Sequence, residues 1–547
     1  MEKFKAFSKF SGRKGPVVLV IMDGVGISPR EVGDAVKAAH TPVLDELMKT
    51  SLMTELQAHG TAVGLPSDGD MGNSEVGHNA IGAGRVFDQG AMLVNQAIET
   101  GRLWEGETWK KMVSNAKANG ILHFIGLFSD GNVHSHINHL KAMLLRAKEE
   151  GVKKVRLHIL LDGRDVGETS ALEYVIPFEA FLAEINASGV DFAIASGGGR
   201  MNVTMDRYEA DWEIVKRGWQ AHVLAEGDQY PSAETAINSI READPGITDQ
   251  FLPAFVIAKD GKPLGPIQDG DSVIFFNFRG DRGIEISRAF EEADFTKFDR
   301  VRVPKVEYAG MMEYDGDLHI PKQYLVSPPS IDKTLGELLS NTGVTQLAIS
   351  ETQKYGHVTY FFNGNWSGKF NEKLETYIEV PSDRVPFEQR PWMKSAEITD
   401  QLIEELKTGK HKFARVNYAN GDMVGHTGHF YAAVQGVEAV DLALGRLLPV
   451  VKALGGIVLI TADHGNSDEM YELDKKGEPK IGENGKIKPK TSHTLNPVPF
   501  IIYDPQYQNE YQWADVKNPG LANIAATILN LLGYEKHEAY NESLLKF

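Results

Sequence analysis

Cysteine is absent from the chain of 547 residues, so its chemistry must depend on other side chains. The absence excludes disulfides, thiolate nucleophiles and cysteine-rich zinc sites. A bound metal ion would therefore have to be held by carboxylate, imidazole or hydroxyl groups.

Long apolar runs are also lacking. The longest, such as 16–22 and 455–460, have the length of a strand and are far too short to span a membrane. Residues 1–14 are basic and aromatic but lack the apolar core of a secretory signal. We therefore expect a cytoplasmic protein with no membrane partner.

Positive charge is scarce, with 57 Lys and Arg against 75 Asp and Glu, and the formal net charge is −18. This balance argues against a nucleic-acid partner, which requires a broad basic surface. A small anionic substrate is compatible with it if arginines and lysines gather locally.

The length exceeds one ordinary core and implies at least two domains. We expect a monomer that acts on a small molecule.

Short β-rich runs alternate with helical stretches, which is typical of an α/β fold with a mainly parallel sheet. The runs 17–21 and 457–460 are apolar on both faces, as expected of fully buried strands. Each leads into an acidic residue, Asp23 in one case and Asp463 in the other. Because ligand sites of open α/β sheets gather at the carboxyl ends of strands, these positions favour a shared site.

A second group of strand-like runs lies in the middle of the chain, and each run ends in a polar cluster. These runs cover 122–128, 155–161, 192–195 and 273–278. We interpret them as a second α/β domain, 89–325, inserted into a discontinuous domain made of 1–88 and 326–547. Pro328 and Pro329 break regular structure near the second boundary.

The strongest functional signal is a set of oxygen and imidazole side chains, namely Asp23, Ser74, Asp422, His426, Asp463, His464 and His493. Asp422 and His426 are four residues apart, a spacing that one helical turn brings to one face. Carboxylate and imidazole ligands suit Mn²⁺, Zn²⁺ or Co²⁺, and Mg²⁺ less well. Each motif alone is more often a capped loop or a surface pair, so the predicted metal centre depends on their joint occurrence. Two neighbouring ions would clamp the attacking and leaving oxygens of a phosphoryl transfer.

Ser74 is the candidate nucleophile, within the segment 71–78. Gly72 permits a close backbone approach, and a helix starting at this point would attract a phosphate to its amides. A serine hydroxyl is a weak nucleophile at neutral pH, and metal coordination can activate it. The alternative is an N-cap serine, the commoner role for serine at a helix start.

Arginines follow the strand-like runs of the middle domain, at Arg164, Arg200, Arg207, Arg279 and Arg282. Arginine binds carboxylate and phosphate groups through two parallel hydrogen bonds. Lys354 is a candidate phosphate contact from the first domain, and we expect it to be catalytic. His134 and Asp165 are candidates for proton transfer to and from a substrate hydroxyl.

Long motifs occur in order along most of the chain, at 23–26, 71–85, 129–136, 162–165, 354–360, 421–428, 461–466 and 491–494. In residues and order they resemble the cofactor-independent phosphoglycerate mutases of the alkaline phosphatase superfamily. The resemblance implies an alkaline-phosphatase-like domain that holds the metals and the serine, with a phosphotransferase domain inserted into it.

The resemblance also implies an activity, the interconversion of 3-phosphoglycerate and 2-phosphoglycerate in glycolysis and gluconeogenesis through a phosphoserine on Ser74. It implies two divalent ions, for which we expect manganese, and no 2,3-bisphosphoglycerate. One ion is expected on Asp422, His426 and His493, and the other on Asp23, Ser74, Asp463 and His464. The substrate positions are His134, Arg164, Asp165, Arg200, Arg207, Arg279, Arg282 and Lys354.

Two departures from the pattern point to one branch of the family. Many bacterial members carry tryptophan where Val25 stands. The segment from Ser196 to Arg200 and the spacing to Arg207 resemble plant and trypanosomatid members.

Two other functions are compatible with parts of the sequence. A metal-dependent phosphomonoesterase or related mutase, such as a phosphopentomutase, would use the same catalytic core. The arginine-rich insert argues against a broad phosphatase, which needs no contact with a carboxylate. A catalytically inactive metal- or metabolite-binding protein is the other alternative, and the intact Ser74 with its full ligand set argues against it.

Overall fold

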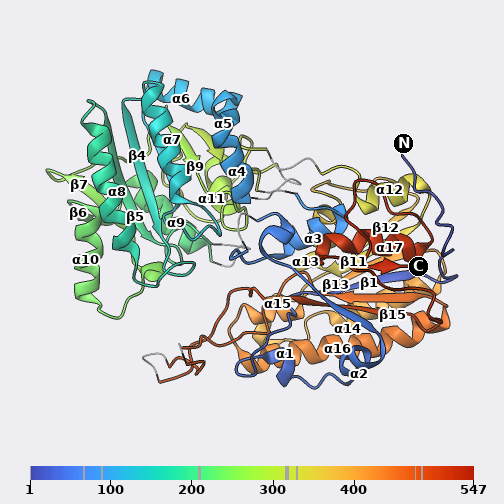
Figure 1. Cartoon of the computed structure of the whole chain (residues 1–547). Helices are drawn as coiled ribbons and strands as arrows, with labels where there is room; N and C mark the ends of the chain where they lie inside the picture. The colour runs from blue at the N-terminus through green and yellow to red at the C-terminus, as the bar shows by residue number, and fades with distance from the viewer. Residues whose placement is uncertain are drawn as a thin grey trace. The chain divides into compact units, whose positions relative to one another are not determined.

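The computed structural model describes residues 2–65, 68–87, 90–206, 211–314, 319–327, 331–474, 476–481 and 485–547. The chain forms two compact units (Figure 1). The first unit consists of Met1–Gln89 together with Pro329–Phe547, and the second of Gly90–Pro328. The sequence predicts domain boundaries after residues 88 and 325, and the structure divides the chain after Gln89 and Pro328.

A seven-stranded sheet, counted over the described residues, forms the centre of the first unit. Five consecutive strands run parallel, and β15 is antiparallel to both of its neighbours. The strand order is β12 (Glu375–Val380), β11 (Gln346–Glu351), β13 (Phe413–Tyr418), β1 (Val17–Met22), β14 (Ile457–Thr461), β15 (Val498–Tyr503) and β2 (Leu52–Leu56). The prediction of an α/β fold with a mainly parallel sheet is confirmed.

β1 lies in the middle of this sheet because it is apolar on both faces. Every residue of the strand is buried. It pairs in parallel with β13 on one side and β14 on the other, with Val17 opposite both Phe413 and Ile457. Because of this common register, the residues that follow these strands emerge at one edge of the sheet.

Helices cover both faces of this sheet, with α14 and α16 on one face and α3 and α17 on the other (Figure 1). In α16 the buried residues Val440, Leu444, Leu447 and Val451 recur every three or four positions, the spacing of an amphipathic helix. The helices of this unit are α1 (Ala35–Ala38), α2 (Pro42–Thr50), α3 (Ser74–Ala83), α12 (Leu335–Thr342), α13 (Thr352–Gly356), α14 (Ser395–Lys407), α15 (Asn420–Gly425), α16 (Phe430–Ala453) and α17 (Ile524–Leu532). A short ribbon pairs β16 (Gln512–Trp513) with β17 (Leu545–Lys546).

The second unit contains its own sheet, which is parallel except where β7 pairs with β5 and with the short β8. Its strand order is β10 (Glu307–Gly310), β9 (Ser272–Phe275), β3 (Leu122–Leu127), β4 (Lys154–Leu161), β5 (Asp191–Gly199), β7 (Phe255–Lys259) and β6 (Asp228–Tyr230), with β8 (Lys262–Pro263) beside β7. Its helices are α4 (Gly90–Glu99), α5 (Arg102–Glu105), α6 (Glu107–Asn119), α7 (Ile137–Glu149), α8 (Ala171–Asn186), α9 (Trp212–Trp219), α10 (Ala233–Ala243) and α11 (Ile284–Glu291).

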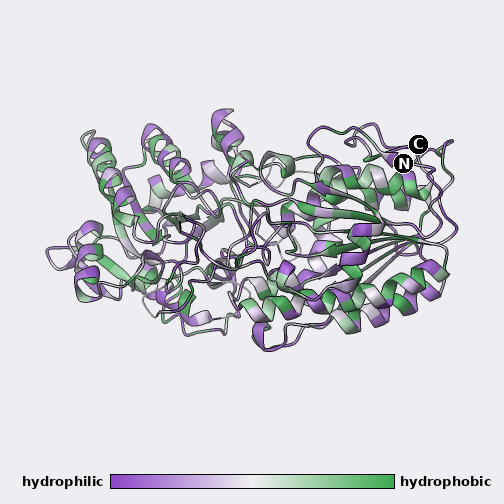
Figure 2. Cartoon of the chain, turned by 60° about the horizontal axis from the view of Figure 1, so that its bottom comes forward, coloured by the Kyte–Doolittle hydropathy of each residue, from purple (hydrophilic) through white to green (hydrophobic). Residues whose placement is uncertain are grey.

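Apolar side chains fill the space between sheet and helices in each unit, and Figure 2 shows the hydrophobic colour concentrated along the strands. In the second unit the two faces of the sheet have separate cores. Phe124 and Leu157 belong to one of them, and Ile125 and Leu160 to the other. Over the described residues, none of the helices is both long and apolar enough to cross a membrane.

Candidate metal centre and nucleophile

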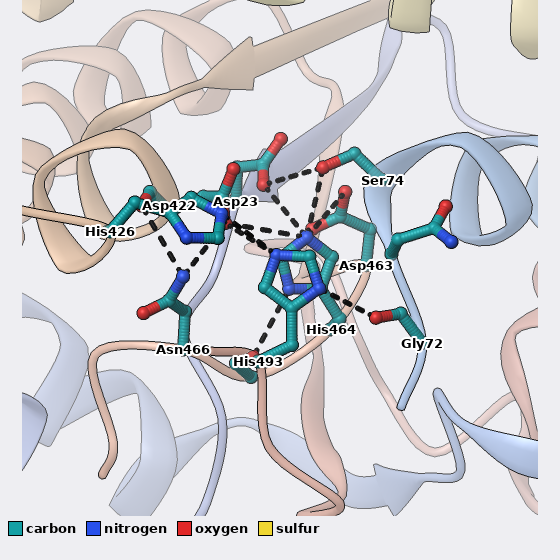
Figure 3. Close-up of polar contacts among 12 residues, drawn as sticks. Asp23, Gly72, Ser74, Asp422, His426, Asp463, His464, Asn466 and His493 are labelled. Atoms are coloured by element: carbon teal, nitrogen blue, oxygen red, sulfur yellow. Dashed lines mark hydrogen bonds and ion pairs between the residues drawn. The ribbon is translucent and has the colours of Figure 1, made fainter. Parts of the chain in front are cut away.

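Strand ends and one short helix bring the predicted ligand residues of the first unit together (Figure 3). Asp23 follows β1, and Asp463 and His464 follow β14, at the same edge of the sheet. Asp422 lies in α15, with His426 as the C-cap of that helix. The spacing of four residues therefore places Asp422 and His426 on one helical turn, as predicted, with His426 Nε2 3.1 Å from Asp422 Oδ1.

Ser74 is the first residue of α3 and is buried. The N-cap of this helix is Asn73, whose side chain accepts a hydrogen bond from the Val76 amide, so the alternative of Ser74 as the N-cap is wrong. Ser74 Oγ instead lies 3.2 Å from Asp23 Oδ1 and 2.9 Å from His464 Nε2. The hydroxyl is thus free to take part in chemistry rather than in capping.

Gly72 is required by the approach of a neighbouring strand end. A Cβ at this position would lie 2.0 Å from the carbonyl oxygen of Ala58, so any side chain would displace the backbone. The Gly72 carbonyl in turn accepts a hydrogen bond from His493 Nδ1 at 2.7 Å.

The three histidines share one orientation. Each uses Nδ1 toward a backbone carbonyl: His426 toward Thr491 at 2.7 Å, His493 toward Gly72 at 2.7 Å and His464 toward Gly465 at 3.2 Å. Their Nε2 atoms, the ring nitrogens left to bind a metal ion, lie 3.1, 3.1 and 3.8 Å from Asp422 Oδ1. Neutral imidazoles in this orientation direct their Nε2 lone pairs to one place, where a cation, either a proton or a metal ion, removes their repulsion.

Asp23, Asp463 and His464 form a second group whose ligand atoms lie within 4.8 Å of one another. Within the described part of the chain, neither oxygen of Asp463 accepts a well-aligned hydrogen bond, although both are buried. Buried carboxylate oxygens without donors are costly, and metal coordination satisfies them. Both groups therefore fit divalent ions, and His464 is within reach of the Asp422 group as well as its own.

Lys354 places its ammonium in the middle of this site. Its Nζ lies 2.5 Å from Ser74 Oγ, 2.8 Å from Asp422 Oδ2 and 3.2 Å from Asp23 Oδ2. The side chain is buried, as a lysine is only when it is paired. A positive charge beside the hydroxyl favours its deprotonated form.

Buried charges in this site hold several pKa values far from their usual range. Burial opposes the charge of His464, but Asp463 and Asp422 outweigh it and raise the pKa of His464 to about 9. Burial lowers the pKa of His493 to about 3, and His464 acts in the same direction. Despite its burial, Asp422 has a pKa well below its usual value because Lys354 and His426 face it.

Three polar residues outside the predicted site support the ligands. His78 Nδ1 lies 2.8 Å from the Ser74 carbonyl and 3.3 Å from Asp463. Asn417, in β13, donates to Asp23 at 2.7 Å, and Asn466 donates to Asp422 at 3.0 Å. His78 and Asn466 lie inside the motifs 71–85 and 461–466, so the sequence contains a signal for both. Asn417 has no such signal, because its approach to Asp23 depends on the pairing of β13 with β1.

The second unit gathers its charged residues at the carboxyl ends of β4, β5 and β9. Arg200 is almost fully buried, and its guanidinium donates to Asp162 at 2.8 Å and to Asp165 at 2.5 Å. Asp162 also accepts a hydrogen bond from Ser129 at 2.5 Å. In this arrangement Arg200 orients Asp165, the predicted proton carrier.

A second part of the same cluster surrounds Asp281. Arg279 Nε lies 3.2 Å and His134 Nδ1 3.5 Å from this carboxylate. Arg282 donates to the Met205 carbonyl at 2.5 Å. Burial holds the pKa of His134 well below its usual value, and Arg200 lowers it further, so this imidazole is neutral.

Two further predicted substrate residues belong to this region of the sequence. Arg164 lies in the turn after β4, where its backbone amide donates to Asp162 at 3.2 Å. Arg207 lies outside the described residues. The structure thus brings the seven predicted metal residues and Lys354 together in the first unit, and His134, Asp165, Arg200, Arg279 and Arg282 together in the second.

Comparison with known proteins agrees with this geometry. The sequence matches the Metalloenzyme superfamily over residues 15–536. A probable 2,3-bisphosphoglycerate-independent phosphoglycerate mutase of Leptospira interrogans is 54% identical over 545 residues, covering 99% of each chain. The 2,3-bisphosphoglycerate-independent phosphoglycerate mutase of Trypanosoma brucei is 53% identical, with 97% of each chain covered. A crystal structure of Leishmania mexicana phosphoglycerate mutase, determined at low cobalt concentration, is 51% identical, covers 100% of both chains and superposes with a TM-score of 0.86.

Proposed function

The chain belongs to the 2,3-bisphosphoglycerate-independent phosphoglycerate mutases of the Metalloenzyme superfamily, and we propose that it moves the phosphoryl group through Ser74. The enzyme interconverts 3-phosphoglycerate and 2-phosphoglycerate and uses divalent metal. We further propose a phosphoserine intermediate on Ser74, the residue roles given below and manganese as the metal.

The observation that carries the proposal is the setting of the Ser74 hydroxyl. Its oxygen is within 3.2 Å of Asp23, His464 and Lys354. A buried serine has no structural need for two potential metal ligands and an ammonium group around its oxygen. The same environment stabilises the alkoxide that attacks phosphorus and the phosphoserine that results.

Asp422, His426 and His493 would hold one ion, and Asp23, Ser74, Asp463 and His464 the other. When bound, the ions neutralise negative charge on the serine oxygen and the phosphoryl group. Mixed carboxylate and imidazole ligands favour Mn²⁺, with Co²⁺ and Zn²⁺ as substitutes and Mg²⁺ as the weaker alternative. Asn417 and Asn466 donate to Asp23 and Asp422 and hold these carboxylates in place, while His78 donates to the Ser74 carbonyl.

Phosphoryl transfer by this chain has two halves. Ser74 attacks phosphorus as the alkoxide that Lys354 stabilises, the bond to the glycerate oxygen breaks, and protonated Asp165 supplies the proton that the leaving hydroxyl needs. In the second half the other hydroxyl gives its proton to Asp165 and attacks the phosphoserine, and Ser74 leaves as the alkoxide again. Lys354 neutralises charge on the phosphoryl oxygens during both transfers.

The arginines of the second unit bind the glycerate through its carboxylate. Arg164, Arg279 and Arg282 are the proposed contacts, with Arg207 added from the sequence, while Arg200 orients Asp165. His134, held neutral by its surroundings, accepts or donates a hydrogen bond to the substrate. Family membership also supports a role in glycolysis and gluconeogenesis, in the cytoplasm and as a monomer.

A two-product assay tests the proposal. Purified enzyme with Mn²⁺ is given 3-phosphoglycerate without 2,3-bisphosphoglycerate, and 2-phosphoglycerate and inorganic phosphate are measured together. We expect 2-phosphoglycerate to dominate and an acid-trapped protein to carry one phosphoryl group on Ser74. Phosphate as the main product would identify a phosphomonoesterase, and a strict need for 2,3-bisphosphoglycerate would overturn transfer through Ser74.

A further inference from the structure

Six buried polar side chains of the second unit form one continuous hydrogen-bonded series, here called the histidine chain. It begins at Asp271, just before β9, and ends at Thr204, in the segment after β5. The contacts are Asp271 Oδ2–His123 Nε2 at 3.0 Å, His123 Nδ1–His158 Nε2 at 2.9 Å, His158 Nδ1–Ser196 Oγ at 2.7 Å, Ser196 Oγ–His222 Nδ1 at 2.7 Å and His222 Nε2–Thr204 Oγ1 at 2.9 Å. All six residues are at most 2% exposed.

The hydrogen bonds of the histidine chain all have their donors and acceptors in one fixed order. Asp271 accepts amide hydrogens from Ile121 and Gln268, both at 2.7 Å, and its pKa is lowered despite burial because His123 donates to it. An ionised carboxylate fixes the hydrogen of His123 on Nε2, so Nδ1 of that ring accepts from His158. Ser196 then donates to His158 and accepts from His222 Nδ1. Thr204 must therefore donate its hydroxyl hydrogen to His222 Nε2.

A β-bulge places the middle of the histidine chain. Leu157 pairs with Ile194, but His158 pairs with Ser196, so that Ala195 is an extra residue on β5. The extra residue turns Ser196 toward the same face of the sheet as His158. Without it, His158 would lie opposite Ala195 and the series would be interrupted.

This polar series crosses a face of the sheet that is otherwise apolar, next to Ile125, Leu127 and Leu160. Replacing both partners of a buried hydrogen bond by apolar groups of the same shape is often nearly neutral for stability. A satisfied buried network, by contrast, fixes atom positions closely because each displaced member leaves another unsatisfied. The histidine chain is therefore better suited to setting geometry than to adding stability.

Thr204, the end of the histidine chain, has a constrained backbone. Its φ of 69° is in the left-handed region, which β-branched residues rarely adopt. A Cβ at Gly218 would lie 2.0 Å from Thr204 Oγ1, so the hydroxyl fits closely against α9. The Thr204 amide also donates to the Ile214 carbonyl at 2.8 Å.

The residue that follows Thr204 connects this geometry to the arginine cluster. The carbonyl of Met205 accepts a hydrogen bond from Arg282 Nη1 at 2.5 Å, and Met205 itself is fully buried. We propose that Thr204 and His222 are positioning residues, which fix the Met205 carbonyl and thereby orient the Arg282 guanidinium for substrate. The inference rests on the proposed role of Arg282 in substrate binding.

Kinetics of two variants at one position test the proposal. Thr204→Val keeps the shape and β-branching of threonine but removes the hydroxyl, whereas Thr204→Ser keeps the hydroxyl. We expect Thr204→Val to raise KM about tenfold with kcat within about twofold, since a contact shared by ground and transition states is weakened. Thr204→Ser should stay within about twofold of the wild-type KM. Wild-type KM in Thr204→Val overturns the proposal.

A matched control and a double variant exclude a general packing effect. Thr248 Oγ1 is also buried and has no hydrogen-bond partner in the described chain, so Thr248→Val should leave KM unchanged. Thr204→Val combined with Arg282→Ala should add little to the KM of Arg282→Ala alone. If the effects of the two substitutions on KM are fully additive in free energy, Thr204 does not act through Arg282 and the proposal is wrong. An unchanged KM in Arg282→Ala overturns the substrate role of Arg282, and with it the proposed positioning role of Thr204 and His222.

Tautomers give a readout that does not depend on activity. Imidazole ¹⁵N spectra of the holoenzyme, assigned with single-histidine variants, should show His123 and His158 protonated on Nε2 and His222 on Nδ1. Ser196→Ala should change the signals of His158 and His222 together and raise KM in the same direction as Thr204→Val. An Nε2-protonated His222, or unlinked responses, overturns the proposal even if a variant folds poorly.

Discussion

The Nε2 atoms of His426 and His493 lie 3.0 Å apart, while the Nδ1 of each ring points to a backbone carbonyl. Two neutral imidazoles cannot share this geometry comfortably, because both present a lone pair to the same point. The two Nε2 atoms are therefore placed to bind a cation.

Chelation is therefore expected to remove activity and to lower the melting temperature together. The metal binds only the folded ligand set, so its removal also removes binding free energy from the native state. Activity and thermal unfolding after dialysis against a chelator, and again after Mn²⁺ or Co²⁺ is added, measure both effects. Full activity with metal absence verified would falsify the two-metal proposal.

Metal affinity should increase with pH because His464 must lose a proton to become a ligand. With its pKa raised to about 9, this histidine is protonated at neutral pH in the metal-free protein. That proton stabilises the metal-free fold at pH values below the unfolded pKa of 6.5, and the contribution is lost as pH rises through about 9. Mn²⁺ titrations should show affinity rising by up to about tenfold per pH unit in this window. Superimposed titrations at pH 7 and pH 8.5 would contradict the expectation.

Ser74→Ala should lower kcat by about four orders of magnitude or more, because it removes the group that takes up the phosphoryl. Its Mn²⁺ content should remain substantial, since three other ligands of that ion persist. Steady-state kinetics and metal analysis measure the two effects. Ser8→Ala, a change at an exposed serine, is the control. Near-normal turnover in Ser74→Ala would exclude the covalent route.

Arg200→Ala should destabilise the protein by about 3–5 kcal/mol, because it leaves Asp162 and Asp165 buried without their partner. Arg446→Ala is the matched control, since this arginine pairs with Asp400 at the surface and its loss should cost less than about 1 kcal/mol. Urea unfolding of the holoenzyme measures both changes, with Arg200→Ala affecting the second unit and Arg446→Ala the first. Equal losses in the free energy of unfolding would show that the buried ion pair contributes no more to stability than the surface pair.

Asp34→Asn should stabilise the protein at pH 8 and have little effect at pH 4. Burial raises the pKa of Asp34 to about 7, and Asp468 adds to the shift. A raised carboxyl pKa means that the free energy of unfolding falls as pH rises from 3.8 to about 7. Asparagine keeps the N-cap of α1 without the charge, so a gain of about 2 kcal/mol is expected at pH 8.

Thermal unfolding at the two pH values measures the effect of Asp34→Asn. Asp211→Asn, at the exposed N-cap of α9, is the control and should change stability by less than about 0.5 kcal/mol. The expectation fails if Asp34→Asn is equally stabilising at both pH values.

The sequence predicted those parts of the fold that depend on local pattern. The apolar runs at 17–21 and 457–460 are β1 and β14, and the acidic residues after them lie where parallel strand ends meet. The predicted strand 273–278 is longer than the observed strand β9, which ends at Phe275. Asn277 explains the difference, since its side-chain oxygen takes the Leu127 amide in place of a backbone carbonyl.

Other features depended on contacts between distant residues and gave no local signal. The N-cap of α3 is Asn73 rather than Ser74, although either residue type is suitable. Arg200 is typical of a substrate arginine in sequence, and only the placement of Asp162 and Asp165 shows that its guanidinium is already engaged. The histidine chain likewise joins strands whose order in the sheet the sequence did not give.

The central place of β1 has a consequence for biosynthesis. Its two neighbours begin at Phe413 and Ile457, so the apolar run Val17–Met22 has no strand to pair with until most of the chain has left the ribosome. The second unit, Gly90–Pro328, is complete well before that point and can fold first. During translation an unpaired, fully apolar strand must therefore be kept from aggregating while a finished domain lies downstream of it. Expression yield of this enzyme should accordingly depend on chaperones that shield nascent chains more than on the stability of the folded protein.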